Sequence, residues 1–498
     1  MKQHAIAATM ALGGLILAAL AAPPAVTAPS ALVKAVSTGE LSSGPSQGPQ
    51  SRRGTAWTAV KAPLPPGAAK NPHAGLWGVA CPSASACVAV GYYTDSAGSQ
   101  QVLLLTGHGA AWTATTAPLP PGADRKARNG PEPPTALYSL TCPSVSVCVA
   151  TGYYTDSLGS FDGLLLTKQG PAWTAAAAPM PGGGSMGVVY DVACPSPATC
   201  VAVGSADSGP QRGVLLTRHG SAWTATGAPP PAHAGTVTNV LLTTVTCPSA
   251  DSCVATGGYI NSSGRQWPLL VTGHGTSWKT TAAPLPAGAA STADAGLSRA
   301  ACPAATACAA TGVYTNPSGG YQPFVLTGHG SAWTAAPAPL PADAAATSSL
   351  AGTGLSHVAC PSADSCVAAG HYTDTAGQQH ELLLTGHGAA WKLATAPLPA
   401  GAATNPKASL WQVACPSISA CIATGYYTDK AGSQQGLLLT GHGAAWKLAT
   451  APLPAGAATN PKTSLLYATC QSATTCVVAG DYTDSTGSRQ GMLLTGPA

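Results

Sequence analysis

The sequence predicts an all-β fold, an eight-bladed β-propeller of four-stranded antiparallel blades. Two cysteines six positions apart recur eight times and account for all 16 cysteines. The first cysteines of successive pairs are 52 to 61 residues apart, which indicates one structural unit repeated along the chain and stacked on its neighbours. Each unit contains short apolar runs separated by turn residues, and no segment keeps a helical period.

The chain opens with a segment typical of an export signal. Lys2 precedes a weakly apolar run over residues 5–22, and small residues suited to a signal peptidase follow. We expect a signal peptide over residues 1–28, a Ser/Pro/Gly-rich flexible linker over 29–53 and the propeller over 54–498. A membrane anchor is the alternative for the first segment. The prediction is a secreted, extracellular protein with no membrane span after signal cleavage.

One repeat illustrates the four strands. Apolar or β-branched runs cover residues 76–81, 87–93, 101–106 and 112–116. A cysteine loop, an Asp-containing turn ending in Gly98, and a Gly-His-Gly turn separate them in that order. Four such runs predict one antiparallel sheet.

The two ends of the array distinguish a closed ring from an open solenoid. The repeats begin in a fourth strand, at Trp57, and stop after a third strand, at Leu493 and Leu494. The first segment therefore supplies the strand that the last repeat lacks, and we predict that N- and C-terminal segments pair to close the ring. Eight fourth-strand tryptophans match the eight cysteine pairs: Trp57, Trp112, Trp173, Trp223, Trp278, Trp333, Trp391 and Trp446.

The cysteines predict one disulfide per blade. Export to an oxidising compartment and an even cysteine count both favour closed pairs. A zinc site needs four ligands and each distant repeat offers two, so zinc is the weaker alternative. The predicted pairs are Cys81 with Cys87, Cys142 with Cys148, Cys194 with Cys200, Cys247 with Cys253, Cys302 with Cys308, Cys360 with Cys366, Cys415 with Cys421, and Cys470 with Cys476.

The repeat unit resembles secreted actinobacterial propeller repeats of the BNR/Asp-box class, which includes sialidases and photosystem II assembly factors. The resemblance rests on L-x-x-V-x-C-P-S-x-x-x-C-V-A-x-G followed by L-L-T-x-H-G-x-x-W, and covers about residues 54–496. Gly109 and Trp112 match the Asp-box turn, whereas its Asp is missing and the loop is one residue shorter. The resemblance implies the fold and is unspecific for activity.

Composition excludes several classes of function. Charged residues are 8% of the chain and the formal net charge is +4, which provides no basic stripe for nucleic acid. The glutamates are Glu40, Glu132 and Glu381, so paired carboxylates and a sialidase-type arginine triad have little support. We expect no catalytic residues, no cofactor and no metal. The leading function is a non-catalytic, monomeric propeller that binds an extracellular glycan, peptide or protein; the alternatives are a sialidase-like glycoside hydrolase and a structural cell-surface component.

Two recurrent turns could suggest metal binding. Six blades have one histidine each in a His-Gly turn, at His108, His219, His274, His329, His387 and His442, where the side chains cannot converge on one ion. Aspartates or asparagines stand in the turn after the second strand, and one carboxylate with a few carbonyls falls short of calcium's six to eight oxygens. We therefore interpret both as turn residues, the second as Asx turns.

The candidate site comes from comparing the repeats with one another. Residues 437–465 repeat residues 382–410 with one change, so such copied segments are scaffold. In contrast, all eight residues differ three positions before the first cysteine of each pair, in the strand assigned to the inner ring: Gly78, Ser139, Asp191, Thr244, Arg299, His357, Gln412 and Tyr467.

We predict a ligand site at the channel mouth from these positions and the aromatic residues that precede some of them. The candidates are Asp191, Arg299, His357, Tyr467, Trp77, Tyr138, Tyr190 and Trp411. A water-filled channel whose lining has no role is the alternative, with the tryptophans packing between blades. The loop over residues 122–136 is either a recognition loop, through Asp124, Arg125, Lys126, Arg128 and Glu132, or a solvated insertion.

Overall fold

The computed structural model describes residues 56–124, 134–183, 187–207, 211–231, 234, 239–345 and 352–498. The predicted signal peptide and linker lie outside these residues, as do Arg125, Lys126, Arg128 and Glu132 of the predicted recognition loop. Within the described part, no helix has the length and apolar character to span a membrane.

Eight separate four-stranded antiparallel sheets make up residues Ala56–Ala498. In seven of them the strands follow the chain order from the inner to the outer edge. The first strands are β2 (Gly75–Ser83), β6 (Thr135–Ser144), β10 (Gly187–Ser196), β14 (Val240–Ser249), β18 (Ala295–Ala304), β22 (Gly354–Ser362), β26 (Ser409–Ser417) and β30 (Ser464–Ser472).

The second and third strands form the middle of each sheet. The second strands are β3 (Ala86–Thr94), β7 (Val147–Thr155), β11 (Thr199–Asp207), β15 (Ser252–Ile260), β19 (Ala307–Thr315), β23 (Ser365–Thr373), β27 (Ala420–Thr428) and β31 (Thr475–Thr483). The third strands are β4 (Gln100–His108), β8 (Phe161–Gln169), β12 (Gln211–His219), β16 (Gln266–His274), β20 (Tyr321–His329), β24 (Gln379–His387), β28 (Gln434–His442) and β32 (Arg489–Gly496).

The fourth strands are shorter and lie at the outer edge. They are β5 (Ala111–Thr116), β9 (Ala172–Ala177), β13 (Ala222–Gly227), β17 (Ser277–Ala282), β21 (Ala332–Pro337), β25 (Ala390–Leu393), β29 (Ala445–Leu448) and, in the last sheet, β1 (Thr58–Lys61). The described helical structure is one short 3₁₀ turn, η1 (Pro181–Gly183). Most strands extend one or two residues beyond the predicted runs.

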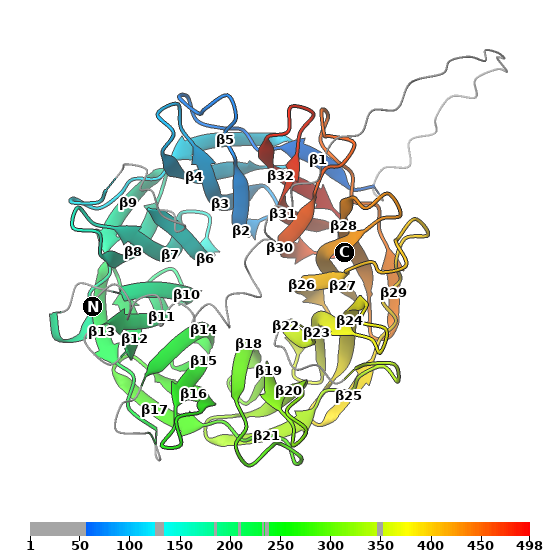
Figure 1. Cartoon of the computed structure of the whole chain (residues 1–498). Coiled ribbons are helices and arrows are strands. Elements are labelled where there is room, and N and C mark those ends of the chain that lie inside the picture. The colour runs from blue at the N-terminus through cyan, green and yellow to red at the C-terminus, as the bar shows by residue number, and fades with distance from the viewer. Residues whose placement is uncertain are drawn as a thin grey trace. The chain divides into compact units, whose positions relative to one another are not determined.

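Ring closure is confirmed. Strand β1 pairs antiparallel with β32, with Thr58 opposite Thr495 and Lys61 opposite Met492. The first strands of successive sheets contact one another around the whole circle, and β30 contacts β2. Figure 1 shows these first strands nearest the middle of the ring. The fold is therefore an eight-bladed propeller whose last blade contains both ends of the array.

The predicted disulfides are confirmed, one in each blade, and no cysteine is free. The zinc alternative is therefore wrong. The cysteines lie within the first and second strands, and the hairpin beyond them is tight, because Ser83 pairs with Ala86. Each disulfide links strands that the hairpin has already brought together.

The core lies between the blades. Leu103 and Leu105 pack with Leu493 and Val477 of the last blade, whereas Leu104 packs with residues of the following blade. Successive side chains of a strand point to opposite faces of the sheet, so a third strand must be apolar at every position to contact both neighbours. This accounts for the unbroken Leu-Leu-Leu runs.

The turns follow the Asx interpretation. The Oδ1 atom of Asp95 accepts hydrogen bonds from the backbone N–H groups of Ala97 and Ser99, at 3.0 and 2.9 Å. The same pair of bonds holds the turns at Asp156, Asn261, Asn316, Asp374, Asp429 and Asp484. The turn histidines are exposed, and the described residues contain no group of three or more His, Cys, Asp or Glu side chains that could hold a metal.

Candidate functional site

Each inner strand contains a β-bulge just before the variable position. In β2 the pairing with β3 skips Trp77, between Leu76 and Gly78, and in β10 it skips Tyr190, between Val189 and Asp191. The same shift precedes the variable residue in the other six first strands. A bulge changes the direction in which the following side chains point. The bulge therefore redirects the side chain of the variable position in every blade.

Seven of the eight variable residues line one cavity of about 370 Å³: Gly78, Ser139, Asp191, Arg299, His357, Gln412 and Tyr467. The eighth, Thr244, is buried, and its hydroxyl bonds to Thr256 at 2.6 Å. The position that varies in every repeat therefore comes together around one space in the structure. Trp77 and Tyr138 also line the cavity, whereas Tyr190 and Trp411 are not among its lining residues.

Asp191 is the centre of a hydrogen-bond network across four consecutive blades. Its Oδ1 atom accepts from Ser139 Oγ at 2.6 Å and from the backbone N–H of Val192 at 3.0 Å. Its Oδ2 atom accepts from the backbone N–H of Val245 at 3.0 Å and from Arg299 Nη1 at 3.1 Å. Asp191 is 6% exposed. These four hydrogen bonds, one of them from an arginine, join the carboxylate to four blades and stabilise the ring.

The opposite side of the cavity contains polar groups without protein partners. His357 Nδ1 is buried and makes no hydrogen bond. Burial, together with the positive charge of Arg299, lowers the pKa of His357 to about 3, so its imidazole is neutral at pH 7. Gln412 donates from Nε2 to the carbonyl of Ala468 at 2.9 Å, which leaves its Oε1 as an acceptor.

Tyr467 completes this side. Burial raises the pKa of its phenol, with Arg299 lowering it and Asp191 raising it further. The hydroxyl is therefore protonated at neutral pH and can donate or accept a hydrogen bond. Together, the imidazole, the carboxamide and the phenol supply donors and acceptors without net charge.

Aromatic pairs surround the inner strands at their bulges. Trp77 packs on Tyr92 with ring centroids 4.6 Å apart, and Tyr138 packs on Tyr153 at 5.8 Å and on Tyr190 at 5.5 Å. Trp411 contacts Tyr426 with centroids 6.3 Å apart. Tyr190 thus packs on Tyr138 of the preceding blade and Trp411 on Tyr426 of its own blade, while Trp77 and Tyr138 are lining residues of the cavity.

A second ion pair lies beside Tyr92, the ring on which Trp77 packs. Arg489 Nη2 donates to Asp481 Oδ2 at 2.6 Å, and the Arg489 guanidinium lies 5.9 Å from the centroid of the Tyr92 ring. Arg489 and Asp481 belong to the last blade, and Tyr92 belongs to the first. Sequence reasoning missed this cluster, because its residues meet only across the closure.

Glu381 lies outside this cavity. It stands on β24 opposite His371, and burial raises the pKa of its carboxyl to about 7. Its Oε2 atom has no hydrogen-bond partner. Asp191 is thus the carboxylate of the cavity among the described residues.

No family model and no curated protein matches this chain. Among solved structures it is similar to the β-propeller domain of the Trilobed protease from Pyrococcus furiosus, at 6% identity and a TM-score of 0.40, covering 76% of this chain and 98% of that one. It is also similar to the GH93 α-L-arabinofuranosidase of Fusarium graminearum, at 10% identity and a TM-score of 0.37, covering 76% of this chain and 95% of that one. Trypanosoma rangeli sialidase matches at 12% identity and a TM-score of 0.33, over 69% of this chain and 56% of its own.

Proposed function

We propose that this protein is a secreted, non-catalytic propeller that binds an extracellular glycan in its central cavity. The observation that carries the proposal is the cavity lining: the one position that differs in every repeat surrounds a space of about 370 Å³. That volume is within the range of ligand sites, about 300–1,000 Å³. Most of the blade is a repeated scaffold, whereas this position has a different side chain in each blade and gives the cavity an asymmetric lining.

The chemistry of the lining favours a neutral, hydroxyl-rich ligand. Asp191 and Arg299 neutralise each other, and His357 is uncharged at pH 7. Trp77 and Tyr138 present aromatic rings to the cavity, and the negative face of such a ring attracts the weakly positive C–H groups of a sugar. A few polar groups among aromatic walls are typical of sites that orient a small ligand.

Hydrolysis is the less favoured alternative. Glycoside hydrolases generally use two carboxyl groups that flank the scissile bond. The described lining has Asp191 alone, and its oxygens already accept four hydrogen bonds. This arrangement supports binding over sialidase-like turnover.

Export has two independent supports. Residues 1–28 have the composition of a signal peptide, and eight disulfides suit an oxidising environment. N-terminal sequencing of protein from a culture supernatant tests this part: the mature chain should begin at residue 22 or 29, and an intact N-terminus would contradict it.

A glycan array with matched tyrosine variants tests the binding site. The wild-type protein should retain a defined subset of glycans. Tyr467→Phe should weaken that binding about tenfold, because it removes one hydrogen bond to the ligand. Tyr321→Phe, which makes the same change outside the cavity, should leave it unchanged.

Three results would contradict the proposal. Two of them are retention of no glycan by the wild type and equal binding by both tyrosine variants. Turnover of a fluorogenic glycoside panel by the wild type would overturn the non-catalytic assignment.

A further inference from the structure

Two adjacent blades break the repeat at one position of the third strand. Six blades have glycine opposite the second cysteine, at Gly107, Gly273, Gly328, Gly386, Gly441 and Gly496. The other two have Lys168 on β8 and Arg218 on β12. The glycine is a steric requirement, since a Cβ on Gly107 would lie 2.0 Å from the carbonyl oxygen of Ala111. A cation at this position therefore requires a different turn.

The two blades have that different turn. The pairing of second and third strands continues one residue further, through Val147 with Gln169 and Thr199 with His219. Gly170 and Gly220 then donate backbone hydrogen bonds to the neighbouring cysteine loops, at 2.8 and 2.9 Å. The altered turn and the basic residue occur together in both blades, which indicates that they form one structural feature.

Arg218 is a buried cation without an acidic partner. It is 2% exposed, and no carboxylate in the described residues lies within ion-pair distance of it. Its Nη1 atom donates to the carbonyl of Pro197 at 3.3 Å and lies 3.9 Å from Cys200 Sγ, while its Nε–H has no acceptor. A buried, unpaired guanidinium costs several kcal/mol. This cost favours an anion that the protein itself does not supply.

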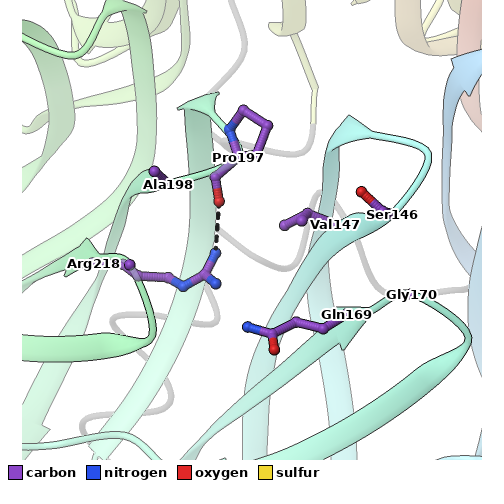
Figure 2. A pocket seen from close by; sticks show the side chains of 8 residues that line it. Ser146, Val147, Gln169, Gly170, Pro197, Ala198 and Arg218 are labelled. Carbon is purple, nitrogen blue, oxygen red and sulfur yellow. Dashed lines mark hydrogen bonds between the residues drawn. The ribbon is translucent and has the colours of Figure 1, made fainter.

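A pocket of about 430 Å³ opens beside this guanidinium, between the blades of β6–β9 and β10–β13. Figure 2 shows the guanidinium of Arg218 and the carboxamide of Gln169 facing each other from the two blades. Ser146 also lines the pocket. Val147, Pro197 and Ala198 supply apolar walls. Lys168 is not among the lining residues, and its Nζ donates to the carbonyl of Val145 at 3.0 Å.

We propose that this inter-blade pocket binds a carboxylate, with the Arg218 guanidinium as its ionic partner. A guanidinium matches the two oxygens of a carboxylate in one plane, and the Gln169 amide adds a further donor. A phosphate would need more donors and more positive charge than this pocket offers. The proposal is independent of the glycan site, because the pocket shares no lining residue with the channel cavity.

Titration of the folded protein with N-acetyl-glutamate tests the pocket, with affinity measured by calorimetry and, in proteins that keep Arg218, by the Nε–H resonances of nitrogen-labelled arginine. We expect a saturable shift of the Arg218 signal and no shift with N-acetyl-glutamine amide, in which both carboxylates are replaced by amides. Arg218→Met should weaken binding about tenfold or more, since a hydrogen bond to a charged group is lost. Arg212→Met, at an exposed arginine of the same strand, should bind as the wild type does.

Folding does not confound this test. Replacing an unpaired buried charge with an apolar side chain of similar length should leave the thermal midpoint unchanged or raise it. A capped Ala-Glu-Ala peptide separates the two sources of a carboxylate: tighter binding of the peptide identifies an acidic segment of a protein, and weaker binding identifies a small acid. Unchanged affinity in Arg218→Met, equal binding of N-acetyl-glutamine amide, or tighter binding of inorganic phosphate would overturn the proposal.

Discussion

On one side of the channel, Ser139, Asp191 and Arg299 direct their polar atoms at one another and at the backbone of β14. On the other side, His357 and Tyr467 have polar groups without hydrogen-bond partners in the described structure. Both sides come from the same position of the same repeat. Comparison of the repeats locates the variable position but does not assign it a role. The hydrogen bonds show which side of the channel stabilises the ring and which side has polar groups available to a ligand.

The largest expected effect comes from removing the centre of the bonded side. Asp191→Ala should lower the free energy of unfolding by about 3 kcal/mol, because it leaves Arg299 and two buried N–H groups without an acceptor. Urea denaturation measures the change. Asp251→Ala, at an exposed aspartate, is the control, and the double variant Asp191→Ala/Arg299→Met should recover part of the loss. Equal stability of Asp191→Ala and the control would remove the distinction between the two sides.

On the side with unpartnered polar groups, the burial of His357 should make the free energy of unfolding depend on pH. The pKa of His357 falls from 6.5 in the unfolded chain to about 3 in the folded protein. The unfolded state therefore binds the extra proton between these values, and the contribution of His357 to stability decreases as pH falls below 6.5. The slope is at most about 1.4 kcal/mol per pH unit. Near pH 5 the wild type should have lost about 2 kcal/mol relative to His357→Gln.

Unfolding curves at pH 7 and pH 5 for both proteins provide the measurement. Glu381 acts in the opposite sense, since its pKa is raised to about 7 and protonation below that value favours the folded state. The difference between wild type and His357→Gln cancels that contribution. If the difference does not change with pH, His357 is not buried as a neutral group.

The smallest effect concerns one donor of the bonded side. Ser139→Ala removes the 2.6 Å bond to Asp191 and leaves three donors on the carboxylate. We expect a loss of about 1 kcal/mol of unfolding free energy, measured by the same urea titration. Ser485→Ala, at an exposed turn serine, should change stability by much less. A loss as large as that of Asp191→Ala would mean that the network fails as a unit.

Most of the fold could be predicted because the repeats inform one another. Eight cysteine pairs and eight tryptophans fixed the number of blades, and the offset between Trp57 and Leu494 predicted the closing strand. The same alignment located the variable ring. These inferences need only distances along the chain.

The site could be predicted only in outline, because its interactions cross the ring. Asp191 and Arg299 are 108 residues apart in the sequence, and no local pattern shows that a blade between them supplies a third partner. The bulges were also missed, since alternation of apolar residues does not reveal a skipped pair. Tyr190 and Trp411 share the position of Trp77 in the repeat, yet they pack on neighbouring rings and are not among the cavity's lining residues. Arg218 was missed because the sequence analysis treated the third-strand turns as one motif.

The pairing of Thr58 with Thr495, 437 residues away, has a consequence for biogenesis. The strand synthesised first cannot find its place until the last blade has emerged, so a nascent chain stays open at one edge throughout its production. Each disulfide, by contrast, joins residues six apart and can form as soon as its own hairpin does. Oxidation can therefore proceed blade by blade with little risk of scrambled partners, while the joining of the two ends, the step with the greatest entropic cost of loop closure, comes last.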